Sequence, residues 1–309
     1  MVTIHPLRLR RWMSPIYHLS PYTGERTNPM SEDSVLVRME KVGFAYDAGN
    51  TAVFGLDAEV RSGEVLLVTG ANGSGKTSLL KLLGGFLVPG EGNVRLGKVD
   101  LEELPDEKVD EWVAFIRTES EKALIGPTVE DELARGCRLA GLSGSAIPHR
   151  VGQALEVVRL RDSRHWYLDE MSVGERRRIA LASSLIGKPR VVLMDDPLAD
   201  LDAAGVRVVG RILRELARRG LGVVFSSHLL DPAIQLADRV LVLDQGEIIA
   251  DGSPAHILEK PDVLQEAGLA LPPAAELFHR LRAHGVMPNV ALPVSMDEAV
   301  EQLVRRLAP

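Results

Sequence analysis

A glycine-rich loop between a predicted strand and a predicted helix constrains the fold more than any other feature of this chain. The apolar run Val65-Leu66-Leu67-Val68 predicts a buried β-strand, and Ser78-Leu79-Leu80-Lys81-Leu82-Leu83 predicts a helix. The loop that joins them, Gly70-Ala71-Asn72-Gly73-Ser74-Gly75-Lys76-Thr77-Ser78, fits the pattern G-x-x-x-x-G-K-S/T completely. This order of strand, loop and helix predicts an α/β fold with a P-loop NTPase parallel sheet core.

The residue types of this phosphate loop (Gly70–Ser78) suit a nucleoside triphosphate. Glycines let backbone N–H groups converge on phosphate oxygens at a helix N-terminus, Lys76 supplies a point charge, and Thr77 offers an oxygen to Mg²⁺. A structural glycine turn explains neither Lys76 nor Thr77 at these offsets. The loop residues predicted to contact the nucleotide are Gly70, Asn72, Gly73, Ser74, Gly75, Lys76, Thr77 and Ser78.

A second polar cluster follows the apolar run Val191-Val192-Leu193-Met194, where Asp195-Asp196-Pro197 end a predicted buried strand. Open α/β sheets bind their ligands at the carboxyl ends of their strands. We expect Asp195 to bind Mg²⁺ and Asp196 to orient or deprotonate the attacking water. Acids after an apolar strand more often form a solvated loop, so this prediction depends on their sharing a chain with the phosphate loop.

The remaining pattern predicts several units around this core. Alternating apolar residues from 35 to 60 predict an antiparallel β subdomain, and residues from about 127 to 185 predict an inserted helical subdomain. We therefore expect a nucleotide-binding domain over residues 34–252 and a small α-rich C-terminal extension over 253–309, a possible dimerisation region. Residues 1–33 are interpreted as a flexible extension or as the result of a start codon placed too early.

The composition of the chain excludes several classes of function and site. The net charge is -7, whereas a general nucleic-acid surface needs clustered excess Lys and Arg, so we expect no nucleic-acid partner. Cys137 is the only cysteine, which excludes an internal disulfide framework and a Cys-based zinc site and favours the cytoplasm. No apolar run approaches the roughly 20 residues of a membrane-spanning helix, so a membrane role requires partners.

The segment Met171–Arg178, here called the signature segment, resembles the L-S-G-G-Q signature of ABC ATPases. The resemblance implies that Ser172, Gly174 and Glu175 serve a nucleotide held by a second ABC ATPase subunit, in a homodimer or a heterodimer. It also implies that His228 is the switch histidine beside the catalytic carboxylate and that Tyr46 stacks on adenine. ATP and Mg²⁺ are the implied cofactors, and ATP hydrolysis is the implied activity.

Two further segments are similar to the ATPases of energy-coupling factor (ECF) transporters: Gly126–Leu133 and the tail that begins with Gly268-Leu269-Ala270-Leu271-Pro272-Pro273. This resemblance implies an importer of vitamins or of cobalt or nickel ions. The chain would be peripheral at the cytoplasmic face of the cell membrane. Its partners would be a transmembrane coupling protein and a substrate-capture protein.

Four positions depart from the family pattern. Thr118 stands where the family has the Q-loop glutamine, a metal and water ligand, and Glu119 beside it is a candidate substitute. Asp196 stands where most members have glutamate, which withdraws the carboxylate by about 1 Å. Val173 and Glu175 replace a glycine and the glutamine of the signature. The hypothesis is an asymmetric heterodimer in which this chain binds ATP and hydrolyses it slowly.

Three alternatives stay open. The departures favour a nucleotide-responsive regulatory subunit without meaningful catalysis. A non-transport ABC ATPase would usually carry two cassettes or a long coiled-coil insertion, and this chain has one phosphate loop with ordinary spacing to Ser172. A P-loop kinase would leave the signature segment and His228 unexplained.

Overall fold

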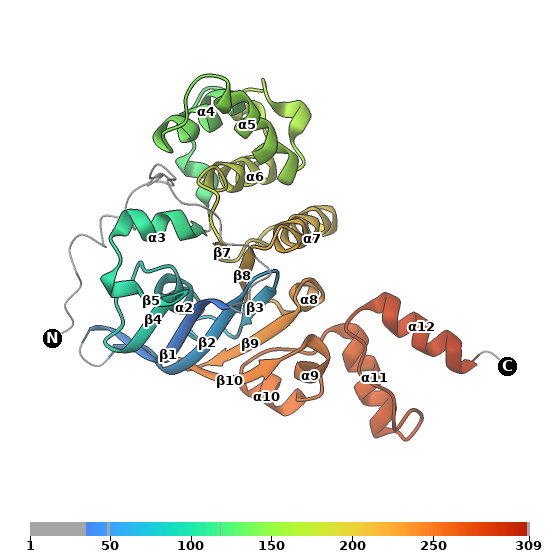
Figure 1. The fold of residues 1–309 in the computed structure, drawn as a ribbon. Coiled ribbons are helices and arrows are strands. Elements are labelled where there is room, and N and C mark those ends of the chain that lie inside the picture. Colours follow the sequence, from blue (N-terminus) through green and yellow to red (C-terminus); the bar gives the residue numbers. More distant parts are fainter. Residues whose placement is uncertain (1–34, 48–49, 118, 308–309) are drawn as a thin grey trace.

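The computed structural model describes residues 35–47, 50–117 and 119–307. The N-terminal segment predicted to be an extension and Thr118, the predicted metal ligand, lie outside the described residues. The described part contains a six-stranded sheet, a four-stranded sheet and a set of helices around them (Figure 1). This arrangement confirms the predicted α/β fold class.

The six-stranded sheet has the order β10-β9-β3-β8-β7-β6 and is parallel except for the antiparallel edge pair β9 and β10. Its strands are β3 (Val65–Thr69), β6 (Val113–Ile116), β7 (Val191–Met194), β8 (Gly222–Ser227), β9 (Arg239–Asp244) and β10 (Glu247–Gly252). Every residue of β3, β7 and β8 is buried, as expected for strands covered on both faces. Because β3, β8 and β7 are parallel neighbours, their carboxyl ends meet at one edge.

The four-stranded sheet is antiparallel and has the order β2-β1-β4-β5, which confirms the predicted antiparallel unit. Its strands are β1 (Val35–Asp47), β2 (Asn50–Arg61), β4 (Glu91–Leu96) and β5 (Val99–Asp100). Helix α2 (Lys76–Leu83) contributes Leu79, Leu80, Leu82 and Leu83 to a core that also contains side chains from both sheets. The helix that begins at the phosphate loop is therefore fixed between the two sheets.

Side-chain alternation along β3 separates two cores. Leu66 and Val68 face the core that contains α2, whereas Val65 and Leu67 face a second core on the opposite side of the sheet. The second core joins the sheet to the helices that follow β6 and β7 and to the C-terminal helices. Burial on both faces leaves the carboxyl-end edge of the parallel strands as the place for polar chemistry.

The span predicted to be helical holds three longer helices, drawn in green to yellow above the sheets in Figure 1. They are α4 (Val129–Leu139), α5 (Ala146–Val157) and α6 (Val173–Ser184). The other helices among the described residues before 252 are α3 (Asp106–Trp112), α7 (Ala203–Arg218) and α8 (Leu230–Ala233), with short 3₁₀ turns at Leu101–Glu103, Ser120–Ala123, Arg161–Ser163, Leu168–Glu170 and Ile234–Leu236. The predicted helical insertion is thus present, and the exact domain limits stay predictions.

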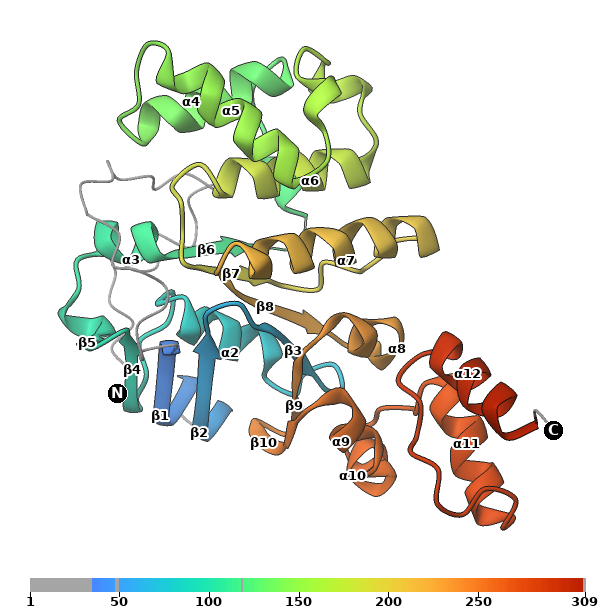
Figure 2. The ribbon, with the colours of Figure 1, turned by 45° about the vertical axis from the view of Figure 1, so that its right-hand side comes forward.

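Four helices follow β10; the first two lie beside β10, and the last two lie farther from the sheet (Figure 2). They are α9 (Pro254–Leu258), α10 (Pro261–Glu266), α11 (Pro273–Ala283) and α12 (Met296–Leu307). Leu264, Ala275 and Phe278 join the second core, so the extension is packed against the part that contains the six-stranded sheet. Within the described ranges, no helix is both long and apolar enough to cross a bilayer.

A buried carboxylate holds the loop between β6 and α4. Glu132 is 0% exposed, and its Oε2 accepts hydrogen bonds from the N–H groups of Ile125 (3.1 Å) and Gly126 (2.7 Å). Its Oε1 accepts from Nη2 of Arg135 at 3.0 Å. Gly126 cannot carry a side chain here, because a Cβ would lie 2.7 Å from the Glu132 nitrogen. The buried carboxylate therefore has a donor for each of its oxygens and ties the loop to the start of α4.

We expect Glu132→Ala to lower the free energy of unfolding by about 3 kcal/mol, because it removes the acceptor of two backbone N–H groups and breaks an ion pair whose carboxylate is fully buried. Urea unfolding followed by circular dichroism measures the change. Glu156→Ala is the control, since Glu156 is exposed on α5, and it should shift stability by less than about 0.5 kcal/mol. Equal effects of the two substitutions would contradict the role given to Glu132.

Candidate nucleotide site

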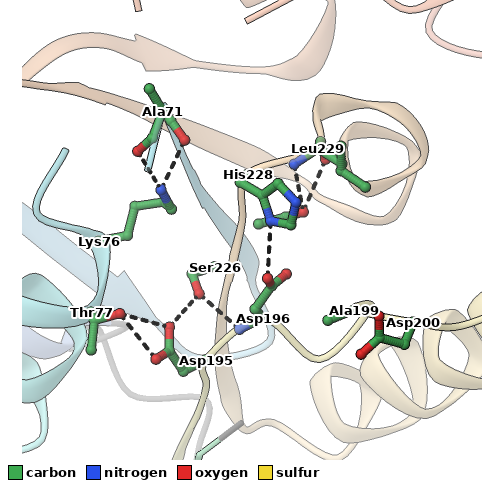
Figure 3. Close-up of polar contacts among 12 residues, drawn as sticks. Ala71, Lys76, Thr77, Asp195, Asp196, Ala199, Asp200, Ser226, His228 and Leu229 are labelled. Carbon is green, nitrogen blue, oxygen red and sulfur yellow. Dashed lines mark hydrogen bonds and ion pairs between the residues drawn. The ribbon is translucent and has the colours of Figure 1, made fainter. Parts of the chain in front are cut away.

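The predicted site residues come from the carboxyl ends of three adjacent strands. The phosphate loop follows β3, Asp195 and Asp196 follow β7, and Ser226, Ser227 and His228 end or follow β8. Figure 3 shows Thr77, Asp195, Asp196, Ser226 and His228 converging at this edge. The sheet order thus brings together residues that lie more than a hundred positions apart in the sequence.

The conformation of the phosphate loop explains its glycines. Gly70, Gly73 and Gly75 have φ angles of 149°, 84° and 104°, a region that L side chains rarely adopt. A Cβ on Gly70 would lie 2.1 Å from the Leu243 carbonyl oxygen, and one on Gly75 would lie 2.8 Å from the Ala52 carbonyl oxygen. No side chain caps the N-terminus of α2. Its first N–H groups are therefore free of a capping acceptor and suit a phosphate oxygen.

Lys76 folds back onto its own loop. Its Nζ donates to the carbonyl oxygens of Gly70 (2.8 Å) and Ala71 (2.7 Å). Burial lowers the pKa of the Lys76 ammonium, and the negative charges of Asp196 and Asp195 act in the opposite direction. A bound polyphosphate would supply a stronger counter-charge than two carbonyl dipoles. This side chain therefore fits the role predicted for it.

Thr77 and Asp195 form a pair of hard oxygen groups beside the loop. The Thr77 hydroxyl donates to Oδ2 of Asp195 at 3.0 Å and lies 3.2 Å from its Oδ1. Magnesium prefers oxygen ligands and is commonly held by one or two carboxylates together with substrate phosphates. The described residues contain no group of three or more His, Cys, Asp or Glu side chains that could hold a metal alone. The pair fits an ion that arrives with ATP.

Asp196 and His228 meet at the same edge. Nδ1 of His228 lies 3.0 Å from Oδ2 of Asp196, and both side chains are partly exposed. Asp196 has a φ of 48°, a left-handed conformation that Asp tolerates better than most residues. Phosphoryl transfer depends mainly on positioning and charge. The predicted catalytic pair is thus in contact, and its catalytic role stays a prediction.

Ser226 is a site residue to which the sequence pattern assigned no role. Its hydroxyl donates to Oδ1 of Asp195 at 2.7 Å and accepts from the N–H of Asp196 at 2.9 Å. The side chain is 1% exposed. The sequence feature that could have indicated this role is a serine at the end of a predicted strand, two positions before His228. Ser226 therefore fixes the Asp195 carboxylate and the Asp196 backbone relative to β8.

Tyr46 contacts the phosphate-loop helix. Its hydroxyl lies 3.1 Å from Oγ of Ser78, and its ring packs edge-on against Phe44 with centroids 5.0 Å apart. Lys81 lies over the Tyr46 ring, with Nζ 6.0 Å from the centroid. These contacts hold the ring beside α2. Stacking on adenine stays a prediction.

The signature residues lie at the N-terminus of α6. Ser172 is the N-cap: its hydroxyl accepts from the N–H of Glu175 at 3.3 Å and donates to Oε2 of Glu175 at 2.7 Å. Oε2 of Glu175 also accepts from the N–H of Ser172, and these hydrogen bonds lower the pKa of Glu175. A Cβ on Gly174 would meet nothing within 4 Å. Among the described residues, no hydrogen bond joins these three residues to the phosphate loop.

Two acidic residues that follow Thr118 each contact a basic side chain. Glu119, the candidate substitute, is exposed, and a hydrogen bond from Lys122, whose Nζ is 2.7 Å away, lowers its pKa. Glu121 is nearly buried and lies 3.4 Å from Nε of Arg177, which also donates to the Ala199 carbonyl oxygen at 2.8 Å. Arg177 on α6 therefore connects the segment after Thr118 to the loop after Asp196.

We expect Ser226→Ala to raise the Mg²⁺ concentration needed for half-maximal Mg²⁺-dependent ATP binding by about tenfold, because a group that orients a metal ligand is lost. ATP binding in excess EDTA should not change. Titrations with a fluorescent ATP analogue measure both quantities, and Ser226→Thr, which keeps the hydroxyl, should restore the parent value.

Ser184→Ala is the matched control, since the Ser184 hydroxyl bonds only within α6 to the Ala180 carbonyl oxygen. An unchanged Mg²⁺ requirement in Ser226→Ala would show that Asp195 needs no help from β8.

Comparison with known proteins agrees with this geometry. A family profile described as ABC transporter matches residues 53–199. The structure of cbiO1 from Clostridium perfringens, described as part of the ABC transporter complex cbiONQ, has the same fold with a TM-score of 0.71 and 23% identity, covering 83% of this chain and 100% of that chain.

Curated relatives extend the similarity over most of the chain. The energy-coupling factor transporter ATP-binding protein EcfA of Methanothermobacter thermautotrophicus is 33% identical over 274 residues, 88% of this chain and 88% of that protein. EcfA1 of Symbiobacterium thermophilum is 34% identical over 255 residues, 82% of this chain and 88% of that protein. With the phosphate loop, the paired carboxylates and the signature segment in place, the chain belongs to the family of energy-coupling factor transporter ATP-binding proteins.

Proposed function

We propose that this chain binds ATP with Mg²⁺ at the phosphate loop and couples closure with a second ATPase subunit to import of a micronutrient. The observation that carries the proposal is the junction of three strand ends, where the Thr77 hydroxyl and the Asp195 carboxylate stand beside the glycine loop. The named relatives are ATP-binding proteins of energy-coupling factor transporters. By analogy the cargo is a vitamin or a cobalt or nickel ion.

The need for a second subunit follows from the position of the signature residues. Ser172 is exposed on α6 and has no hydrogen bond to its own phosphate loop among the described residues. A serine that serves a γ-phosphate must therefore reach the nucleotide of another subunit. Before it does so, its hydroxyl must leave Oε2 of Glu175, 2.7 Å away. The glutamate thus competes with phosphate for the same donor.

We also propose that this chain hydrolyses ATP slowly. The Asp196 carboxylate is one methylene shorter than the glutamate common in the family and already contacts His228 at 3.0 Å. A displacement of about 1 Å can cost on the order of a hundredfold in rate. Together with Glu175, this favours an asymmetric heterodimer whose other subunit carries the regular residues. A regulatory subunit without meaningful catalysis is the second candidate.

The C-terminal extension offers a surface for subunit contact. Met296, Val300 and Val304 stand four residues apart on α12 and are 56%, 52% and 60% exposed. Residues at this spacing share one helix face. An exposed apolar stripe on a helix is typical of a surface covered in an assembly. We assign it to the pairing of the two ATPase subunits.

A second apolar surface suits the membrane partners. Ile125, Trp166 and Tyr167 are 70%, 49% and 55% exposed. They belong to two segments that meet, since the N–H of Val129 donates to the Trp166 carbonyl oxygen and Thr128 pairs with Tyr167. We call the surface formed by Ile125 and the two aromatic residues the aromatic patch. It adjoins the segment after Thr118 and would bind a transmembrane coupling protein at the cytoplasmic face of the membrane.

The purified chain should bind Mg²⁺·ATP tightly and release phosphate slowly, and Lys76→Ala should weaken ATP binding by at least about a hundredfold through loss of the charge at the loop. Calorimetric titration and a phosphate-release assay measure the two properties. Lys108→Ala, which removes an exposed lysine from α3, is the control for charge. ATP binding by Lys76→Ala equal to the parent would overturn nucleotide binding at this loop, and rapid turnover by the chain alone would overturn the asymmetric dimer.

Trp166→Ala should reduce recovery of the chain with its membrane partners in a gentle detergent pull-down by about tenfold, because large aromatic side chains dominate interface energies. Phe54→Ala is the matched control, since Phe54 is 44% exposed on β2, away from the aromatic patch. ATP binding by both variants should match the parent. Equal recovery of the two variants would contradict the assignment of this surface.

A further inference from the structure

The phosphate loop is supported by the C-terminal extension through one backbone hydrogen bond. The N–H of Ala71 donates to the carbonyl oxygen of Ala267 at 3.2 Å. Ala71 is the second residue of the loop, and Ala267 is the C-cap of α10. The two residues are 196 positions apart. Gly268, the residue after Ala267, is the first residue of the tail segment that resembles energy-coupling factor ATPases.

Ala71 is a junction within the loop. Its carbonyl oxygen accepts from Nζ of Lys76 at 2.7 Å and from the N–H of Ser74 at 3.2 Å. Its N–H is used by Ala267. Both backbone polar groups of Ala71 are therefore engaged, the carbonyl oxygen with residues of the phosphate loop and the N–H with the extension. A shift of the extension moves the loop through the same residue.

The end of α10 is built to present this carbonyl. Gly268 has a φ of 68°, its N–H donates to Gln265, and the N–H of Leu269 donates to Leu264. This pattern is a Schellman motif, in which a left-handed residue ends the helix. The last carbonyls of a helix have no partner inside the helix. Ala267 is 1% exposed, so its carbonyl needs the partner that Ala71 supplies.

The turn at Gly268 lies close to the phosphate loop and leaves little space for a side chain there. A Cβ on Gly268 would lie 3.3 Å from Cβ of Ala71, closer than nearly all such contacts in proteins. The extension offers a natural comparison at the end of α11, where Gly285 has a φ of 70° and Val286 donates to Leu281 in the same motif. A Cβ on Gly285 would meet nothing within 4 Å.

We infer that Ala267 and Gly268 are positioning residues of the phosphate loop, so that ATP affinity depends on the seating of the C-terminal extension. The inference rests on the proposed binding of ATP at this loop. Coupling between two sites is reciprocal, so bound ATP must also stabilise the turn. The extension that carries the exposed stripe of α12 is thereby linked to the phosphate loop through a single residue, Ala71.

The test compares Gly268→Ala with Gly285→Ala. Both substitutions introduce a side chain at a left-handed position and should lower the thermal midpoint without nucleotide to a similar extent. Only Gly268→Ala should weaken Mg²⁺·ATP binding, by about fivefold or more, because only its Cβ displaces Ala71. In the Ala71→Gly background the same substitution should lose less affinity, since the crowded atom is absent.

Hydrogen exchange of the parent chain gives a second measurement that needs no variant. A non-hydrolysable ATP analogue should slow exchange over residues 261–269 more than over residues 279–287. Equal ATP affinity of Gly268→Ala and Gly285→Ala, or equal protection of the two segments, overturns the inference. If Lys76→Ala also binds ATP like the parent, the proposed function fails instead.

Discussion

The parallel pairing of β3, β8 and β7 is the constraint on which the rest of the structure depends. Parallel strands end at the same edge, and these three end in a glycine loop, a histidine turn and a pair of carboxylates. Complete burial of the strands on both faces fixes their register. The positions of Thr77, Asp195 and His228 are therefore consequences of sheet order, and the α-helices mainly cover the sheet.

Polar contacts refine what the sheet brings together. The Ser226 hydroxyl connects Asp195 to the backbone of Asp196, and the Asp196 carboxylate in turn meets His228. Each link joins β7 to the end of β8. A partly buried network of this kind restricts side-chain freedom, since each of these members has a defined partner. The Asp196 carboxylate is thus held by His228, and the Asp196 backbone by Ser226.

The surfaces away from the sheet edge carry the features of an assembly. The signature serine is exposed and engaged with Glu175, and apolar side chains are exposed on α12 and in the aromatic patch. The C-terminal extension contacts the phosphate loop directly through Ala267 and Ala71. The proposed sites of subunit contact, membrane contact and nucleotide binding thereby occupy different parts of one packed structure.

The sequence alone determined the phosphate loop, the strands that end in carboxylates, and the helical span before Asp195, because these depend on local spacing and on apolar periodicity. It also indicated the family through the signature segment and the tail. The roles of Ser226, Arg177 and Ala267 were decided only by the tertiary structure. Their contacts join segments that are far apart in the chain, such as residues 71 and 267. Every residue has a backbone carbonyl, so the residue type of Ala267 does not indicate which N–H its carbonyl oxygen accepts from. Pattern and spacing encode what each segment forms, whereas sheet order and packing decide which segments meet.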